Sequence, residues 1–251
     1  MVQRDFFDPA GIMDLGQLSG ASGAHALQIY GDRIYAAKCF LANRPYTLLN
    51  EHVAAGLAQA LNLPIPIIKH IRFQDKLWFG VEWEPAGGHL LTEEKIPLLL
   101  NAQDIPRILA FDVLICNHDR HQGNIVIQQI YPSPERYRLW IIDHSHCLAA
   151  DQLSKDVLIG KNDGPDGKLY ISRLPIFINA VKDINDFDGI LRDIEAIDGI
   201  EISKILQTTP KEWVTHIDDL TFLETFLSER KRKVRSLIAA SVDIFPNIQG
   251  R

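Results

Sequence analysis

The fold of this 251-residue chain is decided by one polar stretch, Asn117-His118-Asp119-Arg120-His121-Gln122-Gly123-Asn124. An almost wholly apolar run, residues 105–116, precedes it and predicts a buried helix. Two strand-like runs follow it, residues 125–130 and 137–142, and the Pro-rich residues 131–135 between them are typical of a turn. The polar stretch is therefore predicted to form a loop between a helix and a β-hairpin, where its side chains are available for chemistry.

A second polar segment, Asp143-His144-Ser145-His146, follows the second strand of this hairpin. The midpoint between positions 124 and 143 falls inside the turn, so antiparallel pairing predicts that Asn124 faces Asp143. An amide oxygen beside a carboxylate suits Mg²⁺, a cation that prefers oxygen ligands. Asp119, on the same loop as Asn124, can then act as a base or orienting group beside the metal.

The N-terminal part contains another candidate hairpin, residues 25–30 and 33–40 joined by Gly31-Asp32. The same arithmetic places Lys38 opposite His25. Directly before His25 lies a small-residue loop whose backbone can approach phosphates closely, Ser19-Gly20-Ala21-Ser22-Gly23-Ala24. A lysine beside such a loop is the arrangement that a nucleoside triphosphate needs.

Lys38 interrupts an apolar strand, so its charge requires a partner. Residues 46–61 carry apolar side chains at helical spacing and end at Leu63-Pro64-Ile65-Pro66. Glu51 shares one face of this predicted helix with Leu48 and Ala55, a poor place for an unpaired carboxylate. We therefore expect an ion pair between Lys38 and Glu51.

Strands dominate the first part of the sequence and helices the last. Further strands are predicted at residues 67–73 and 77–83, before a break rich in Pro and Gly at residues 84–88. From about residue 183 the pattern is helical, with a last helix over residues 220–245. The predicted class is α+β, in one two-lobed domain over residues 1–251. Its parts are a β-rich N-lobe (about 1–80), a hinge (about 81–88) and a mainly helical C-lobe (about 89–251).

Composition restricts the partners that the protein can bind. Lys and Arg total 26 and Asp and Glu total 32, a net charge of −6 that argues against a surface built for nucleic acid or a membrane. The basic run at residues 230–235 lies on a predicted helix with an apolar stripe, so we interpret it as a solvated outer face. Three widely spaced cysteines and an N-terminus without an apolar signal indicate a cytoplasmic protein.

Five residues follow the order of the protein-kinase signature set, from strand lysine and helix glutamate to catalytic-loop Asp and Asn and metal Asp: Lys38, Glu51, Asp119, Asn124 and Asp143. The loop itself resembles that of HipA-like kinases and their phosphatidylinositol-kinase relatives, which reads Asp-x-His-x-x-Asn. The segment from Ile142 to His146 is similar to the Ile-Asp-x-Gly-His metal segment of short HipA-like domains, with Ser145 in place of the glycine. This resemblance covers roughly residues 15–150 and implies a protein-kinase-like fold.

The resemblance also implies ATP and Mg²⁺ as cofactors. The adenine is expected at the backbone near Val81, with Glu82 and Trp83 as its binding residues, and the phosphates are expected under Gly20, Ser22 and Gly23. Lys38, held by Glu51, would bind the inner phosphates, and Asn124 and Asp143 would hold Mg²⁺. Asp119 would accept or orient the proton of the acceptor hydroxyl, while His121 would contact the transferred phosphate or brace the loop.

By the same resemblance, the acceptor is expected to be a serine or threonine of a protein. A lipid or small-molecule hydroxyl is left open, as is an antitoxin or other regulatory partner. Some HipA-like kinases are inactivated by autophosphorylation of a serine in the glycine loop, which makes Ser19 and Ser22 candidates for such a switch. The alternative is that both serines only cap turns.

Two other functions stay open at this point. A pseudokinase would bind nucleotide without transferring phosphate, and Ser145 favours that alternative weakly. A metal-dependent hydrolase would gather His118, His121, His144 and His146 with Asp119, Asp143 and Cys147 around Zn²⁺ or Fe. The hydrolase lacks the usual ligand spacings and leaves Lys38, Glu51 and the glycine loop without a role.

Overall fold

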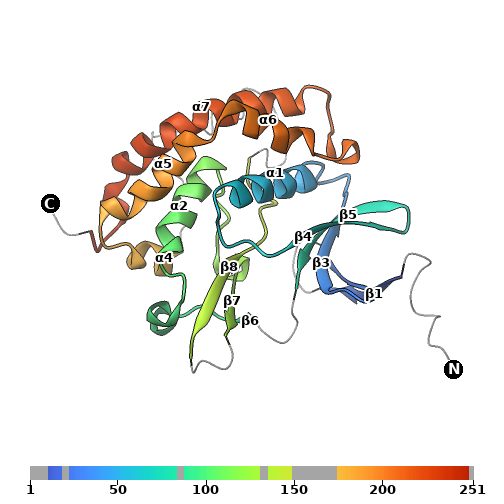
Figure 1. Ribbon diagram of the computed structural model, residues 1–251, viewed down its shortest axis with the longest axis horizontal. Coiled ribbons are helices and arrows are strands. Elements are labelled where there is room, and N and C mark those ends of the chain that lie inside the picture. Colours follow the sequence, from blue (N-terminus) through green and yellow to red (C-terminus); the bar gives the residue numbers. More distant parts are fainter. Residues whose placement is uncertain (1–10, 19–22, 84–87, 131–134, 149–173, 249–251) are drawn as a thin grey trace.

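The computed structural model describes residues 11–18, 23–83, 88–130, 135–148 and 174–248 (Figure 1). A β-rich N-terminal part is followed by a mainly helical C-terminal part, as the sequence predicts. Among the described residues, every helix is too short or too polar to cross a membrane. The division into an N-lobe, a hinge and a C-lobe at residues 81–88 stays a prediction.

The N-terminal part is a five-stranded antiparallel sheet with strand order β1-β2-β3-β5-β4. Its strands are β1 (Ile12–Gln17), β2 (His25–Ile29), β3 (Ile34–Cys39), β4 (Ile68–Phe73) and β5 (Lys76–Glu82). Strand β1 was not predicted, because Asp14, Gly16 and Gln17 interrupt the alternation of apolar and polar residues that marks a strand.

Helix α1 (Thr47–Ala60) connects β3 to β4 and is buried on two sides. Leu49, Val53 and Leu57 belong to the large core of the protein, whereas Leu48 and Ala55 pack against Phe79 of β5. The helix ends where Asn62 adopts φ +51, just before the two prolines that cannot continue it. This double burial fixes the helix between the sheet and the helical part.

A second, three-stranded sheet has the order β6-β7-β8 and lies beside helix α2 (Figure 1). Its strands are β6 (Gly88–His89), β7 (Ile125–Gln129) and β8 (Tyr137–Ile141), and α2 spans Asp104–Leu114. As predicted, α2 is a buried helix, since eight of its residues are inaccessible.

The C-terminal helices are α4 (Pro175–Ala180), α5 (Asp188–Ala196), α6 (Gly199–Gln207) and α7 (Asp219–Ala240). Short 3₁₀ turns are η1 (Glu93–Leu98), η2 (Gln122–Asn124), η3 (Ile184–Phe187), η4 (Lys211–Trp213) and η5 (Val242–Ile244). Helix α6 lies along α1, where a Cβ on Gly56 would come within 2.6 Å of the Ile205 side chain (Figure 1). The C-terminal part thus reaches back to the helix that carries Glu51.

Both predicted hairpins form, but each register is one residue away from the predicted one. His25 pairs with Ala37 rather than Lys38, because three residues, not two, turn the chain between Ile29 and Arg33, with Gly31 at φ +74. In the second hairpin, Ile125 pairs with Ile141, so Asn124 lies opposite Ile142 and not Asp143. A shift of one residue reverses the side-chain face, and the predicted facing pairs were therefore wrong.

The basic run on α7 is only partly a solvated face. Arg230 is 5% exposed, and its Nε and Nη2 donate to the Val113 carbonyl at the end of α2, at 3.0 and 2.9 Å. Arg235 pairs with Glu195 of α5. The apolar stripe of α7 packs into the core. The arginines beside the stripe therefore extend to a carbonyl of α2 and a carboxylate of α5.

Candidate functional site

Lys38 brings three segments of the chain together. Strand β3 directs its side chain into the protein, where Nζ lies 2.6 Å from Glu51 Oε1 on α1. The same nitrogen lies 2.8 Å from Asp143 Oδ1 and 3.0 Å from Ser145 Oγ, just after β8. An ammonium has three N–H donors, so these contacts use all of them. The predicted Lys38–Glu51 ion pair is present.

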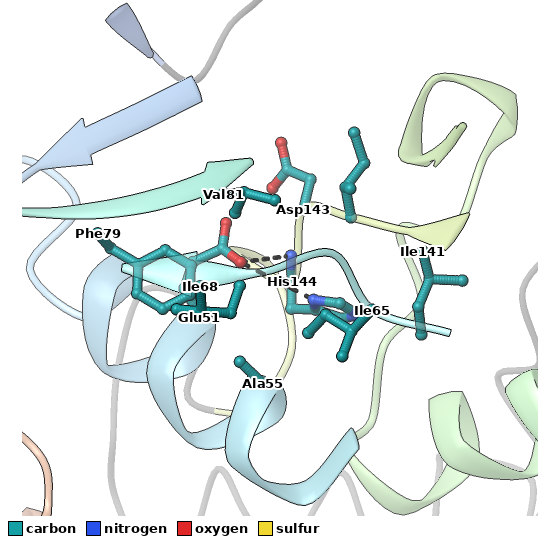
Figure 2. A pocket seen from close by; sticks show the side chains of 10 residues that line it. Glu51, Ala55, Ile65, Ile68, Phe79, Val81, Ile141, Asp143 and His144 are labelled. Atoms are coloured by element: carbon teal, nitrogen blue, oxygen red, sulfur yellow. Dashed lines mark hydrogen bonds and ion pairs between the residues drawn. The ribbon is translucent and has the colours of Figure 1, made fainter. Parts of the chain in front are cut away.

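Glu51 connects α1 to the segment after β8 through its second oxygen. The His144 backbone N–H donates to Glu51 Oε2 at 3.0 Å, as Figure 2 shows. Apolar side chains surround this carboxylate, among them Ala55, Phe79 and Val81, and leave a small hollow between α1, β5 and Asp143. A carboxylate at 2% exposure is tolerated here because both oxygens are bonded.

Asp143 is held as a carboxylate in a strained backbone position. Its φ of +55 lies in the left-handed region that few non-glycine residues adopt, which is a feature of functional sites. Burial alone would raise the pKa of Asp143, but the Lys38 ammonium and the hydrogen bonds from Ser145 outweigh it and hold that pKa well below its usual value. The side chain is therefore an ionised carboxylate at neutral pH.

Ser145, which stands where the HipA-like segments it resembles carry a glycine, takes part in this ion-pair cluster. Its hydroxyl bonds Asp143 Oδ1 and accepts from Lys38, and its carbonyl accepts from the Asn50 side chain at 2.8 Å. The serine thus adds hydrogen bonds to the cluster without displacing any of the expected residues.

The polar loop after α2 is held by its own side chains. Asn124 Nδ2 donates to the Asp119 carbonyl at 2.9 Å, which fixes the orientation of the Asn124 amide. The Asp119 N–H donates to Asn117 Oδ1, and the Gly123 N–H donates to His121 Nδ1, at 3.2 and 3.0 Å. Of the two roles predicted for His121, this bond supports bracing of the loop.

The donor set is suited to Mg²⁺. Asn124 supplies an amide oxygen and Asp143 an ionised carboxylate, the hard ligands that this cation prefers. The backbones of the two segments meet where Ile142 donates its N–H to the Asn124 carbonyl at 3.1 Å. The two predicted metal residues therefore stand at the same end of the hairpin despite the shifted register.

Only some of the residues predicted to bind the nucleotide phosphates lie among the described residues. Gly20 and Ser22, like Ser19, lie outside the described residues. Gly23 has φ +63 and ends the β1–β2 connection, which the Leu18 N–H closes by donating to the Ala24 carbonyl at 2.8 Å.

At the predicted adenine position, two backbone donors at the end of β5 are already used. The Glu82 N–H donates to the Ile67 carbonyl at 2.8 Å, and the Trp83 N–H donates to the Ile34 carbonyl at 2.9 Å. The Glu82 side chain is paired with Arg33. An adenine would therefore have to use other backbone groups of this segment.

The histidines of the hydrolase alternative do not converge. His118 Nδ1 bonds the Cys116 carbonyl, and His144 Nε2 is bonded by Arg120. Burial and the Arg120 charge hold the pKa of His144 well below its usual value, so its ring is neutral at neutral pH. Within the described ranges, no three His, Cys, Asp or Glu side chains form a group that could hold a metal.

Sequence reasoning missed four buried polar residues around the site: Asn50, Asp112, Asn117 and Arg120. Asp112 offered a signal, because it is the one carboxylate inside an almost wholly apolar predicted helix over residues 105–116. Arg120 offered none, since the loop that contains it is polar throughout.

Solved structures share this fold, among them the following two. The crystal structure of a Helicobacter pylori proinflammatory kinase, CtkA, matches with a TM-score of 0.63 and 18% identity, covering 95% of this chain and 96% of CtkA. HipA of the Shewanella oneidensis MR-1 toxin–antitoxin system, solved with HipB and its operator DNA, matches with a TM-score of 0.53 and 14% identity, covering 100% of this chain and 70% of HipA. No protein-family model and no curated protein sequence matches the chain. The likeness confirms the predicted HipA-like kinase fold.

Proposed function

We propose that this protein is an ATP- and Mg²⁺-dependent phosphotransferase of the HipA-like type. The observation that carries the proposal is the Lys38 cluster, in which one buried ammonium bonds Glu51 from α1 and Asp143 from the segment after β8. The fold is shared with the two solved structures above. In protein kinases generally, a strand lysine serves the phosphates and a later aspartate serves the metal.

ATP binding requires an exchange of partners at Lys38. All three of its donors are used in this structure, so Lys38 must release Asp143 or Ser145 in order to bind a phosphate oxygen. Asp143 and Asn124 would hold Mg²⁺, and the bound cation would neutralise charge on the transferring phosphoryl group. Glu51 keeps its bond to the His144 N–H throughout and so keeps Lys38 directed at the site.

Asp119 acts on the acceptor hydroxyl. The Asn124 side chain holds its carbonyl and Asn117 holds its N–H, so the backbone at Asp119 is fixed while its carboxylate is half-buried at the loop surface. A carboxylate placed there can orient the hydroxyl and accept its proton as the phosphoryl group is transferred. We expect the hydroxyl to belong to a serine or threonine of a protein in the cytoplasm, and a lipid or small-molecule hydroxyl is the alternative acceptor.

The experiment that tests this function is incubation of the protein with γ-labelled ATP and Mg²⁺, alone and with cell lysate, followed by mass spectrometry. Wild type should label an acceptor, and Asp119→Asn should bind ATP with unchanged affinity but transfer no phosphate. His118→Gln, which changes an exposed neighbour in the same loop, is the matched control and should retain transfer. Absence of ATP binding by wild type would reject the proposal.

The pseudokinase is the second candidate, favoured by the Ser145 hydroxyl within the ion-pair cluster. It predicts tight ATP binding with the same background turnover in wild type and Asp119→Asn, across protein, lipid and small-molecule acceptors. It also predicts that Ser145→Gly restores turnover. The kinase predicts transfer by wild type without that change.

A further inference from the structure

Arg120 lies in the polar loop at residues 117–124, the proposed catalytic loop, and its side chain forms an extensive set of hydrogen bonds. Its Nε and Nη2 donate to Asp112 Oδ2 and Oδ1 of α2, at 3.0 and 2.9 Å. Its Nη1 donates to the carbonyls of Asn124 and Ile142, at 3.0 and 2.9 Å, and Nη2 also donates to His144 Nε2 at 3.0 Å. A guanidinium has five N–H donors, and these contacts account for all five.

Stability alone is a poor explanation for this arrangement. The side chains of Arg120 and Asp112 both have 0% exposure, and removing two charges from water costs as much free energy as a well-formed pair returns. Apolar residues of similar size at both positions would give comparable stability. What apolar residues cannot do is bond Asn124, Ile142 and His144 at once.

The three groups that Arg120 bonds lie next to the proposed metal residues. One is the carbonyl of Asn124 itself, and the other two flank Asp143 on either side, the Ile142 carbonyl and the His144 ring. Because Asp112 lies on the buried face of α2 and is itself fully buried, this guanidinium is anchored in the core. The separation of Asn124 and Asp143 is therefore set by one rigid, planar group.

We propose that Arg120 is a positioning residue, which fixes Asn124 and Asp143 at the separation that binding of a divalent cation with nucleotide requires. The inference deepens the proposed function and rests on it. The hydrogen bonds of Arg120 go to Asp112, to His144 and to the carbonyls of Asn124 and Ile142, so it acts through the backbone at and beside the two proposed metal residues. Groups that orient metal ligands typically contribute about 10–100-fold to metal affinity.

The test measures Mn²⁺ binding by electron paramagnetic resonance in the presence of saturating ADP, with ADP and Mn²⁺ without protein as the blank. Arg120→Lys keeps the charge but loses the planar fork, and should weaken Mn²⁺ binding about tenfold or more. ADP affinity in EDTA should change less than about twofold, because the phosphates are bound by Lys38. If the role of Arg120 were purely structural, Arg120→Lys would weaken both Mn²⁺ binding and ADP binding.

Arg230→Lys is the matched control. Arg230 is also buried and also bonds a carbonyl of α2, and the partner in these bonds, Val113, belongs neither to the loop at residues 117–124 nor to the segment after β8. This variant should lower the melting temperature and leave the Mn²⁺ affinity unchanged. Equal Mn²⁺ affinity in wild type and Arg120→Lys would overturn the inference.

A double variant separates folding from positioning. Arg120→Met alone leaves Asp112 buried without a cation beside it, which should lower the melting temperature strongly, whereas Asp112→Leu with Arg120→Met should recover much of that loss. Mn²⁺ binding should stay weak in the recovered double variant, and normal binding there would overturn the inference. Wild type that binds no Mn²⁺ with ADP would reject the proposed function itself, a result distinct from wild-type binding that Arg120→Lys leaves intact.

Discussion

Lys38 Nζ lies 2.8 Å from Asp143 Oδ1, so the proposed phosphate-binding cation and the proposed metal-binding carboxylate neutralise each other in this structure. Each residue therefore occupies the position at which the other's ligand would bind, until an anionic nucleotide binds Lys38 and a cation binds Asp143. A nucleotide without a metal, or a metal without a nucleotide, replaces only one of the two partners. This relationship predicts that Mg²⁺ and ATP stabilise the protein far more together than either does alone.

The first prediction concerns that joint stabilisation. At a ligand concentration about 100 times Kd, binding adds about 2.7 kcal/mol, which for a chain of this size raises Tm by about 5–10 °C. Asp143→Asn should abolish the part of the shift that depends on Mg²⁺, as measured by differential scanning fluorimetry. Asp193→Asn, which alters an exposed carboxylate paired with Arg107, is the control and should show the full shift. A Mg²⁺-dependent shift that survives in Asp143→Asn would contradict the assignment of Asp143.

The second prediction concerns the packing that holds α1. Trp213 of η4 is 1% exposed and packs against Leu48, Ala55 and Phe79, so the C-terminal part braces the helix that carries Glu51. Trp213→Ala should cost about 3–5 kcal/mol of unfolding free energy. It should also raise KM for ATP, because Glu51 then holds Lys38 less firmly.

The control for the brace is Phe187→Ala, which empties a fully buried site in the large core away from α1. It should cost a similar free energy in denaturant titrations and leave KM for ATP unchanged. If Trp213→Ala does not fold, Trp213→Phe provides a milder change in the same direction. Equal KM values in the Trp213 and Phe187 variants would show that the brace does not reach the site.

The third prediction is a loss of stability in acid that depends on His52 of α1. Thr208 donates its hydroxyl to the Ile205 carbonyl, so it accepts from His52 Nε2, and the unprotonated Nδ1 then faces His70 Nε2 at 3.3 Å. The groove beside this pair is lined by Lys69 and Lys204, without a carboxylate among its lining residues. Burial, with the adjacent His70, lowers the pKa of His52 to about 4.

The direction of this pH dependence follows from the linkage between proton binding and folding. The unfolded chain binds a proton at His52 below about pH 6.5, and the folded protein does so only near pH 4, so protonation favours unfolding. The stability that neutral His52 contributes is complete above pH 6.5 and is lost as the pH falls to 4, by up to about 3 kcal/mol. Denaturant titrations at pH 7.5 and 4.5 should show a smaller drop in His52→Gln than in wild type. Exposed His216→Gln is the control and should drop as wild type does.

The sequence predicted the helices and strands better than it predicted the pairing register of the strands. Helical spacing and the following prolines predicted α1 to within about a residue at each end, and an almost wholly apolar run predicted α2. Pairing registers were missed by one because they depend on how many residues form each turn, which composition does not fix. The Lys38–Glu51 pair was predictable because a charge on an apolar face needs a partner.

Contacts between distant segments were beyond the sequence. Nothing local indicates that Arg120 bonds Ile142 or that Trp213 packs on Leu48. The first contact depends on the register of the β7–β8 hairpin, and the second depends on how the C-terminal part folds back. The third contact of Lys38, with Ser145, is of the same kind. Such contacts decide the geometry of the site, whereas the chemistry-bearing residues can be read from their order.

The fourth prediction concerns control through Ser19 and Ser22, which lie outside the described residues. A phosphoserine carries a charge of about −1.5 to −2 at neutral pH, so in the loop over the ATP phosphates it would repel the triphosphate and compete for Lys38. Intact-mass measurement after incubation with Mg-ATP should show a phosphate that maps to one of these serines and is absent in Asp119→Asn. The variant Ser19→Ala with Ser22→Ala should stay unmodified and keep its activity on an external acceptor for longer than wild type. Wild type that stays free of phosphate while it phosphorylates an acceptor would rule this switch out and leave the two serines as turn residues.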